Sequence, residues 1–247
     1  MHSGLKRSIF LFVLLLIFSC STIHTRNLEK TISKLTESGI PLQADPNGNV
    51  RWIEAKKGEL TDEFMCYLPN LEKLEWLEIS KSNLSNVGLK YLKNCSGLKR
   101  LYIHDMDLTD KDLTWISGLH NLEALALQNT KIDGRFLKKL NSVETLKVLN
   151  LSGNQITDND MAQIARFKNL EVLSLANTQI RGAGIKTLEG MAHLNEFNIE
   201  NCSITDNDLP SFLSMPNLRI VYARGCNLNN YAIANIIDKF PSLAIFL

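Results

Sequence analysis

The stretch LKVLNLSGNQI at residues 146–156 is followed 24 residues later by LEVLSLANTQI at residues 170–180. Both fit the pattern L-x-x-L-x-L-x-x-(N/T/C)-x-L, and five more copies fit it with other apolar or small residues at some places. A weaker copy begins at Val50. A fixed period of this length indicates stacked units that share one continuous core. The copies begin at Leu74, Leu98, Leu122, Leu146, Leu170, Leu194 and Leu218.

Each copy, here called a coil and numbered from its first residue, has the pattern of a strand followed by a helical return. Positions 1, 4 and 6 are apolar while positions 3, 5 and 7 vary, which is the period-two pattern of a strand. Apolar residues recur at positions 16, 19 and 22, which predicts a short helix or 3₁₀ segment. Most of these segments follow a Ser or Thr that can cap them. Asp133-Gly134 and Arg181-Gly182 depart from this and predict looser segments.

The coils resemble the leucine-rich repeat family, and the cysteines at position 9 of the last two coils resemble its cysteine-containing subclass. The resemblance covers residues 50–247 and implies an α/β leucine-rich repeat solenoid. In such a solenoid a curved parallel β-sheet forms the concave face, and short helices or 3₁₀ segments form the convex face. The family also implies a non-enzymatic protein–protein interaction module that binds its partner through the concave face.

The N-terminus has the pattern of an export signal. Lys6 and Arg7 precede an apolar run over residues 9–18, and this run is shorter than the ~20 residues that a membrane-spanning helix needs. The pattern predicts a signal peptide over residues 1–19.

The apolar run ends at Ile-Phe-Ser-Cys20, which resembles a bacterial lipobox, although Phe18 is bulkier than the usual small residue. The resemblance implies lipid attachment at Cys20, a tether over residues 20–26 and a membrane-anchored protein of the bacterial cell envelope. Ser21 is compatible with sorting to an outer membrane, with the protein either periplasmic or surface-exposed. Ordinary secretion and an uncleaved short anchor are the alternatives.

Residues 27–49 have the features of a cap over the first coil. Leu28, Ile32 and Leu35 are spaced as on one face of a helix, and Gly39 is a typical stop. The turn residues 45–49 then predict a β-hairpin whose second strand is the first coil. We therefore expect a helix and a hairpin strand to cover the open end of the solenoid; the alternative is a flexible stalk.

Composition excludes several functions. The chain has 27 Lys+Arg and 26 Asp+Glu; loss of residues 1–19 removes Lys6 and Arg7 and leaves 25 against 26, a net charge of −1. This balance does not favour nucleic-acid binding. The sequence lacks phosphate-loop and paired metal-ligand motifs, so we expect no cofactor and no metal. We expect no catalytic residues either, because neighbouring strand residues such as His104 and Asp105 point in different directions.

Cys202 and Cys226 occupy position 9 of adjacent coils. Strand spacing places them roughly 5 Å apart, which a disulfide accepts. The alternative is two free thiols in the core, since parallel side-chain directions suit a bridge poorly. In either case, an inward polar or small residue at position 9 is expected to satisfy backbone groups of the turn after each strand.

The variable positions 3, 5 and 7 predict what the concave face presents. Both ends carry large aromatic and charged residues, and the middle carries small ones, a surface that suits a protruding element of a protein partner. The alternative is that Trp52 and Trp76 only cover the cap. The candidate partner-binding residues are Trp52, Trp76, Glu78, Arg100, Tyr102, His104, Val148, Asn150, Val172, Glu196, Asn198, Ile220, Tyr222 and Arg224.

The last coil ends in an apolar stretch, residues 243–247. A terminal strand with an open edge favours strand pairing and an end-to-end homodimer. This gives an alternative function, a structural envelope lipoprotein that self-associates without a dedicated ligand. Protection of the same edge by Phe240 would instead leave it closed.

Overall fold

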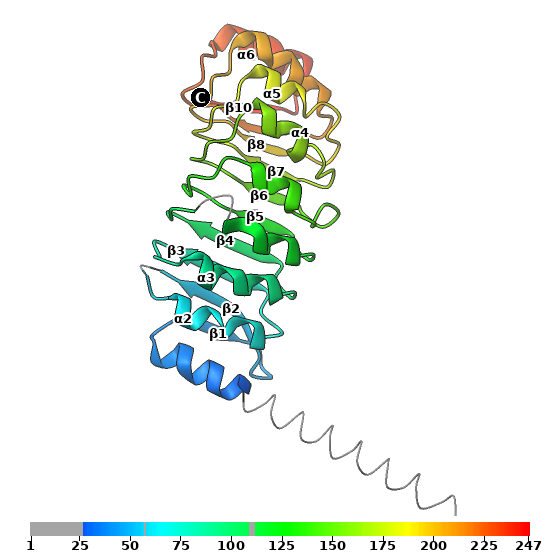
Figure 1. Ribbon diagram of the computed structural model, residues 1–247. Helices are drawn as coiled ribbons and strands as arrows, with labels where there is room; N and C mark the ends of the chain where they lie inside the picture. Colours follow the sequence, from blue (N-terminus) through cyan, green and yellow to red (C-terminus); the bar gives the residue numbers. More distant parts are fainter. Residues whose placement is uncertain (1–26, 57, 109–111) are drawn as a thin grey trace, which may run out of the picture.

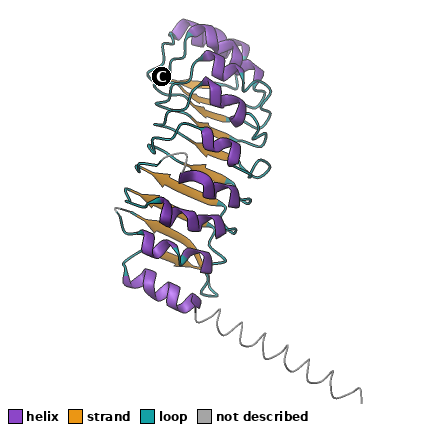
Figure 2. Cartoon of the chain, viewed as in Figure 1, coloured by secondary structure: helices purple, strands orange, loops and turns teal. Residues whose placement is uncertain are grey.

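The computed structural model describes residues 27–56, 58–108 and 112–247. They form an elongated solenoid in which one long sheet lies on one side and short helical segments lie on the other (Figures 1 and 2). The predicted signal peptide, Cys20 and the tether lie outside the described residues.

The ten strands of the sheet follow one another in chain order. The register repeats the 24-residue period, since Trp52 pairs with Trp76, and Trp76 pairs with Arg100. Only the first pair is antiparallel, and every later pair is parallel. The strands are β1 (Leu42–Ala44), β2 (Val50–Ala55), β3 (Trp76–Ser80), β4 (Arg100–His104), β5 (Ala124–Ala126), β6 (Val148–Asn150), β7 (Val172–Ser174), β8 (Glu196–Asn198), β9 (Ile220–Tyr222) and β10 (Ala244–Phe246).

The return paths are short helices and 3₁₀ segments at the predicted places, and the predicted fold class is therefore confirmed. Residues 27–37 form the cap helix. The segments are α2 (Asp62–Met65), η1 (Leu68–Asn70), α3 (Asn86–Leu89), η2 (Lys90–Asn94), η3 (Asp112–Gly118), η4 (Arg135–Lys139), η5 (Asp158–Asp160), α4 (Met161–Ile164), α5 (Gly182–Lys186), η6 (Asp206–Ser214) and α6 (Asn230–Lys239).

The core is one continuous column of apolar side chains between the sheet and the helical segments. In the coil that begins at Leu146, the strand contributes Leu149 and Leu151 and the helical segment contributes Ile164 and Phe167, all fully buried. The same positions are filled in the neighbouring coils. Because each coil packs only on its neighbours, the fold is stabilised along its length rather than around one centre.

The N-terminal cap closes one end of this column. Leu35 of the cap helix is fully buried, and Leu28 and Ile32 pack against the same core. The hairpin turn is held by Asp45, which accepts hydrogen bonds from the backbone and side chain of Asn49. These bonds lower the pKa of the Asp45 carboxyl to about 2.

At Gly134 and Gly182 the chain lies close to an aspartate of the next coil, and neither segment has a side-chain N-cap of its own among the described residues, so the expectation that these segments are looser stays a prediction. A Cβ at Gly182 would collide with the carboxylate of Asp208 in the next coil, and a Cβ at Gly134 would collide with Asp160. Asp208 in turn accepts the backbone N–H of Thr205 at 2.9 Å. Glycine therefore stands here because the helix-capping aspartate of the next coil needs its space.

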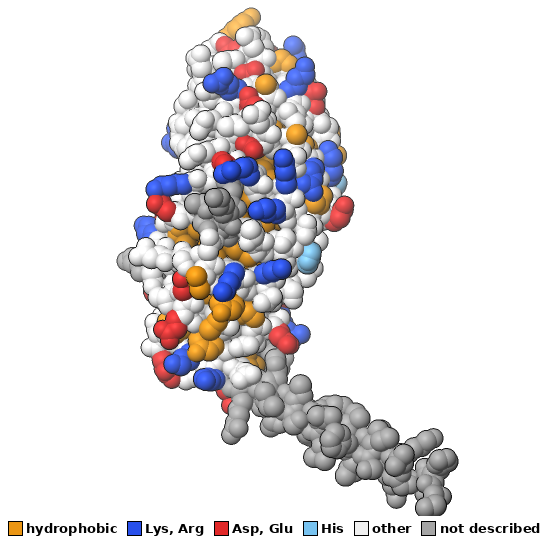
Figure 3. Space-filling view, viewed as in Figure 1, with side chains coloured by type: hydrophobic (Ala, Val, Ile, Leu, Met, Phe, Trp, Pro, Cys, Tyr) orange, Lys and Arg blue, Asp and Glu red, His pale blue; other side chains and the backbone are white. Residues whose placement is uncertain are grey.

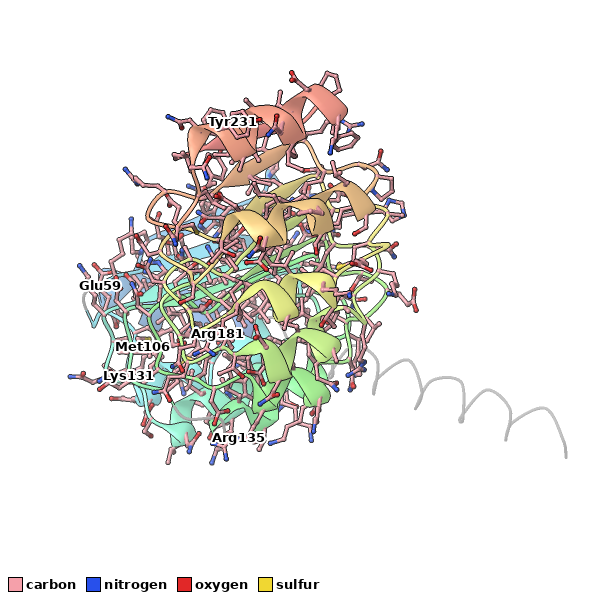
Figure 4. The ribbon with its side chains drawn as sticks, turned by 90° about the horizontal axis from the view of Figure 1, so that it is seen from above. Glu59, Met106, Lys131, Arg135, Arg181 and Tyr231 are labelled. Carbon is pink, nitrogen blue, oxygen red and sulfur yellow. The ribbon has the colours of Figure 1, made fainter. Side chains whose placement is uncertain are left out.

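The view along the solenoid axis in Figure 4 shows the two flanks of the molecule. Glu59, Met106 and Lys131 lie on the flank where the strands end, and Arg135 marks the start of η4 (Figure 4). Tyr231, on α6, is 78% exposed. Among the residues that the structure describes, none of the helices combines the length and the apolar character needed to cross a bilayer.

Candidate functional site

The candidate site is the concave face, the face of the sheet that the helical segments leave uncovered. Positions 3, 5 and 7 of each coil project from it, because alternate strand residues point away from the core. The structure places the predicted residues on consecutive strands, which brings them into three parallel columns. Trp52 lies on β2; Trp76 and Glu78 on β3; Arg100, Tyr102 and His104 on β4; Val148 and Asn150 on β6; Val172 on β7; Glu196 and Asn198 on β8; Ile220 and Tyr222 on β9; and Arg224 just after β9.

The N-terminal end of the face is an aromatic stack. The rings of Trp52 and Trp76 are stacked with centroids 4.4 Å apart, and Tyr102 lies 4.9 Å from Trp76 on the diagonal. The guanidinium of Arg100 lies 5.5 Å from the Trp76 ring, a cation–π contact. Both faces of Trp76 are therefore covered by its neighbours, and a partner would meet ring edges rather than ring faces.

The two tryptophans also contribute to the cap. Trp52 pairs across β1 and β2 with Gln43, and both tryptophans are half-buried. Their Nε1 atoms are buried and have no hydrogen-bond acceptor among the described residues. The aromatic stack therefore helps to cover the hairpin, which is the alternative role considered for Trp52 and Trp76. It also forms the raised N-terminal end of the concave face.

His104 lies between two carboxylates at the same end. Its Nε2 is 3.2 Å from Oε1 of Glu78, and its Nδ1 is 3.6 Å from Oδ2 of Asp105. The expectation that His104 and Asp105 point apart is wrong, because Asp105 adopts a left-handed φ of 56° that turns its side chain back. A hydrogen bond from Asn129, and then the contact with His104, lower the pKa of Asp105.

The middle of the face is a low floor formed by β5, β6 and β7. Ala124 and Ala126 are each 3% exposed although they stand on the uncovered side of the sheet, because larger neighbours rise above them. The Ser152 and Ser174 hydroxyls hydrogen-bond one another at 2.7 Å, and Asn150 Oδ1 accepts the Ser152 N–H at 3.0 Å. These polar groups are thus partly satisfied within the floor, which lowers the desolvation free energy that covering them costs.

The C-terminal end rises again. The Tyr222 ring stacks on Phe246 of β10 with centroids 5.4 Å apart, and Arg224 forms a 3.0 Å ion pair with Glu200. Asn198 Oδ1 accepts the backbone N–H of Glu200 at 2.9 Å. The strands are roughly 4.8 Å apart, so the low floor spans about 19 Å between the raised strands β4 and β8.

Position 9 satisfies backbone groups as predicted. Asn154 Nδ2 donates to the carbonyl of Leu151 at 2.9 Å, and its Oδ1 accepts the backbone N–H of Thr130 at 3.0 Å. Cys202 and Cys226 are free thiols, and their Sγ atoms donate to carbonyl oxygens of the preceding coil at 3.1 and 3.2 Å. Burial raises the pKa of both thiols, which disfavours a reactive thiolate.

The sequence analysis did not identify the column of residues at position 8. Position 8 has a left-handed φ in seven coils, although its residues differ in type. Neighbouring members are joined by side-chain hydrogen bonds of 2.9 Å, from Asn129 to Asp105 and from Asn201 to Asn177. The recurrence of Asn and Gly was the available signal, because these residues tolerate a positive φ. The column comprises Lys81, Asp105, Asn129, Gly153, Asn177, Asn201 and Gly225.

A second column with charges alternating in sign lies at position 2, on the flank where the strands begin. Arg51 and Lys99 both pair with Oε1 of Glu75, at 2.7 and 3.3 Å, and Lys147 pairs with Glu171 at 3.0 Å. Cross-strand pairs of this kind stabilise a sheet modestly. The strict spacing of 24 residues between these charges was the signal that the sequence analysis did not use.

Comparisons with known proteins agree with this geometry. A family described as leucine-rich repeat matches residues 72–132, and one described as leucine-rich repeats in two copies matches residues 144–190. No curated protein matches the chain. The chain therefore contains leucine-rich repeats, and its fold is a leucine-rich repeat solenoid.

Solved structures give the same fold. Internalin C2 from Listeria monocytogenes is similar at 25% identity with a TM-score of 0.59, over 80% of this chain and 79% of that one. A second Listeria monocytogenes internalin has 19% identity and a TM-score of 0.53, over 73% of this chain and 56% of that one. A leucine-rich repeat protein of Leptospira interrogans has 18% identity and a TM-score of 0.51, over 74% and 51%. Repeats of this kind are generally non-enzymatic modules of protein–protein interaction.

Proposed function

We propose that this protein binds a protein partner through its concave face, with the partner seated on the low floor between the two raised ends. The observation that carries the proposal is the floor itself. It is lined by small residues, and its Asn150, Ser152 and Ser174 side chains form internal hydrogen bonds. It is bounded by aromatic and arginine side chains of the type that dominate binding energy at interfaces. Its length of about 19 Å accommodates one helix, whose diameter is about 10–12 Å, or a loop of similar width.

The partner can be identified by photo-crosslinking. We expect a photoreactive amino acid at Val148 or Val172 to crosslink to one and the same protein in intact cells, because both residues line the floor. The matched control is Thr187 on the convex side, which is exposed. Equal crosslinking to that protein from Thr187, or no crosslink from either valine, would contradict binding through the concave face.

We also propose that Cys20 carries the lipid and that the mature protein is held in a bacterial envelope membrane. The support is the sequence pattern of a charged stretch, a short apolar run and the Ile-Phe-Ser-Cys motif. The expected result in intact-mass and peptide mass spectrometry is a mature N-terminus at Cys20 bearing acyl chains. An unmodified N-terminus downstream of Cys20 would contradict the lipid anchor and leave the binding proposal untouched.

Self-association through β10 is the second candidate. β10 pairs with β9 on one side only among the described strands, and Phe246 of this strand is 52% exposed. Phe240, however, packs against the core beside this strand. These observations support the alternative less strongly than the built floor supports partner binding.

A further inference from the structure

The crest of the convex side is basic in the N-terminal half of the solenoid. Positions 17, 18 and 20 form this crest, with the exception of the buried Trp115 at position 18, because positions 16 and 19 point into the core. In the coils that begin at residues 50, 74, 98, 122 and 146, these positions carry no acidic residue. They carry four lysines, all of them exposed: Lys90 and Lys93 in η2, and Lys138 and Lys139 in η4.

Within the part of the chain that the structure describes, the charges of these four lysines are not neutralised. Each of them lacks an ion-pair partner among the described residues. By contrast, Lys99 and Lys147 on the flank are paired with glutamates. Unpaired charges that stand two coils apart, roughly 10 Å at the strand spacing, attract a surface of opposite charge rather than a single small anion.

Apolar side chains lie beside the lysines. Val87 of α3 is 59% exposed, and the half-buried Tyr91 ring has the Lys90 ammonium 5.3 Å from its centroid. Phe64 and Tyr67 of the preceding coil are also half-buried. Figure 3 shows apolar side chains gathered over the lower helical segments, with Lys and Arg side chains next to them and Asp and Glu side chains at the edges.

We propose that this convex basic patch, defined by Lys90, Lys93, Lys138, Lys139, Val87 and Tyr91, rests on the surface of an anionic lipid bilayer. The ammonium groups would lie at the level of the lipid phosphates, where each lysine contributes to binding. Val87 and the Tyr91 ring would enter the interfacial region, which accepts apolar and aromatic side chains. The concave face lies on the opposite side of the solenoid, so this contact turns the partner-binding floor away from the membrane.

A bilayer fits the patch better than a nucleic acid does. The described part of the patch contains lysines and no arginine that could pair with phosphates in two-pronged geometry, and its aromatic ring is already covered by Lys90. The protein as a whole has almost no net charge, with 27 basic against 26 acidic residues. The inference does not depend on the lipid at Cys20, because the patch is part of the folded repeat body.

The test is sedimentation of the full chain with vesicles of phosphatidylcholine alone and of phosphatidylcholine mixed with phosphatidylglycerol. We expect tighter partitioning to the anionic vesicles, weakened by salt because exposed charges are screened within ~10 Å at 0.1 M ionic strength. Changing Lys90, Lys93, Lys138 and Lys139 to Glu should reduce the phosphatidylglycerol-dependent partitioning at least ~100-fold, since each neutralised lysine accounts for about five-fold. Residues 1–26 contain Lys6, Arg7 and Arg26 and are the same in every variant, so binding through them cancels in the comparison between variants.

The matched control reverses four exposed lysines elsewhere, Lys73, Lys81, Lys168 and Lys239, which gives the same net charge. We expect this variant to keep most of the phosphatidylglycerol dependence. Equal loss in both variants, or no preference of the wild type for anionic vesicles, would overturn the proposal. So would a patch that binds duplex DNA and not vesicles. Circular dichroism verifies that both variants fold, and a Lys→Gln set at the patch replaces the Glu set if the latter does not.

Discussion

Replacement of Asn154 by Ala is expected to destabilise the protein by about 3 kcal/mol or more, a large fraction of the stability of a typical domain. Asn154 is 5% exposed and joins two coils. Its amide nitrogen donates to the carbonyls of Leu151 and Ser152, and its carbonyl oxygen accepts from the backbone of Thr130 and Ile132. Alanine would leave the N–H groups of Thr130 and Ile132 and the carbonyl of Leu151 without this partner, whereas the Ser152 carbonyl still accepts the Asn129 N–H. Each unsatisfied buried group costs about 1–3 kcal/mol.

Urea unfolding followed by circular dichroism measures this loss. The matched controls are Thr178→Ala at the same position of the next coil, and Gln155→Ala at the exposed neighbour. Thr178 makes one hydrogen bond to the backbone, at 2.6 Å to Leu175, so we expect about 1 kcal/mol there and close to zero at Gln155. An Asn154→Ala variant within about 0.5 kcal/mol of wild type, which is the size of a typical surface effect, would contradict the bridging role. Asn154→Thr, a residue that this column already uses, provides a measurable variant if the alanine form does not fold.

The sequence predicted the architecture because the repeat constrains every coil in the same way. Once Leu149 and Leu151 are placed inward, Val148, Asn150 and Ser152 must face the other side of the sheet, so the columns of the concave face follow from counting. The stacking of Trp52 on Trp76 could be predicted by the same counting, since the two residues occupy one column in adjacent coils. Tyr102 stands in the next column, and its contact with Trp76 depends on side-chain rotamers that no spacing encodes.

Two other features depended on contacts and backbone conformations that the pattern of a single coil does not encode. The close packing of Gly182 follows from the position of Asp208, which lies a full coil later and caps its own segment. The contact of Asp105 with His104 follows from a positive φ at a residue that rarely adopts one. In both cases the pattern within one coil is not sufficient, because the conformation is set by the neighbour or by a backbone turn.

The low floor was predicted as a set of small residues, and the structure adds the reason why it can be covered. Ser152 and Ser174 satisfy each other, and Ala126 is sunk below its neighbours. A partner that covers this floor gains the burial of the valine side chains without leaving these hydroxyls unpaired. The floor is therefore a better binding surface than its modest apolar content suggests. An added charge on the floor is expected to weaken partner binding.

Introducing arginine at both Val148 and Val172 is therefore expected to weaken partner binding at least ~100-fold, because the long charged side chains would fill the floor and would have to be desolvated without a partner. Arg100 stands in the same column on β4, which shows that an arginine at this position is compatible with the strand. The binding constant for the crosslinked protein would be measured by calorimetry, with thermal unfolding as the check that the solenoid is intact.

Thr187→Arg on the convex side is the matched control, since it adds an exposed arginine in the coil of Val172 without touching the floor. We expect its binding constant to equal that of the wild type. If the Val148→Arg, Val172→Arg variant folds and binds as tightly as the wild type, the partner does not occupy the floor. Loss of binding in Thr187→Arg instead would move the interface to the convex side. The double variant thus tests the low floor, the feature that distinguishes a protein-binding surface from the surface of an ordinary sheet.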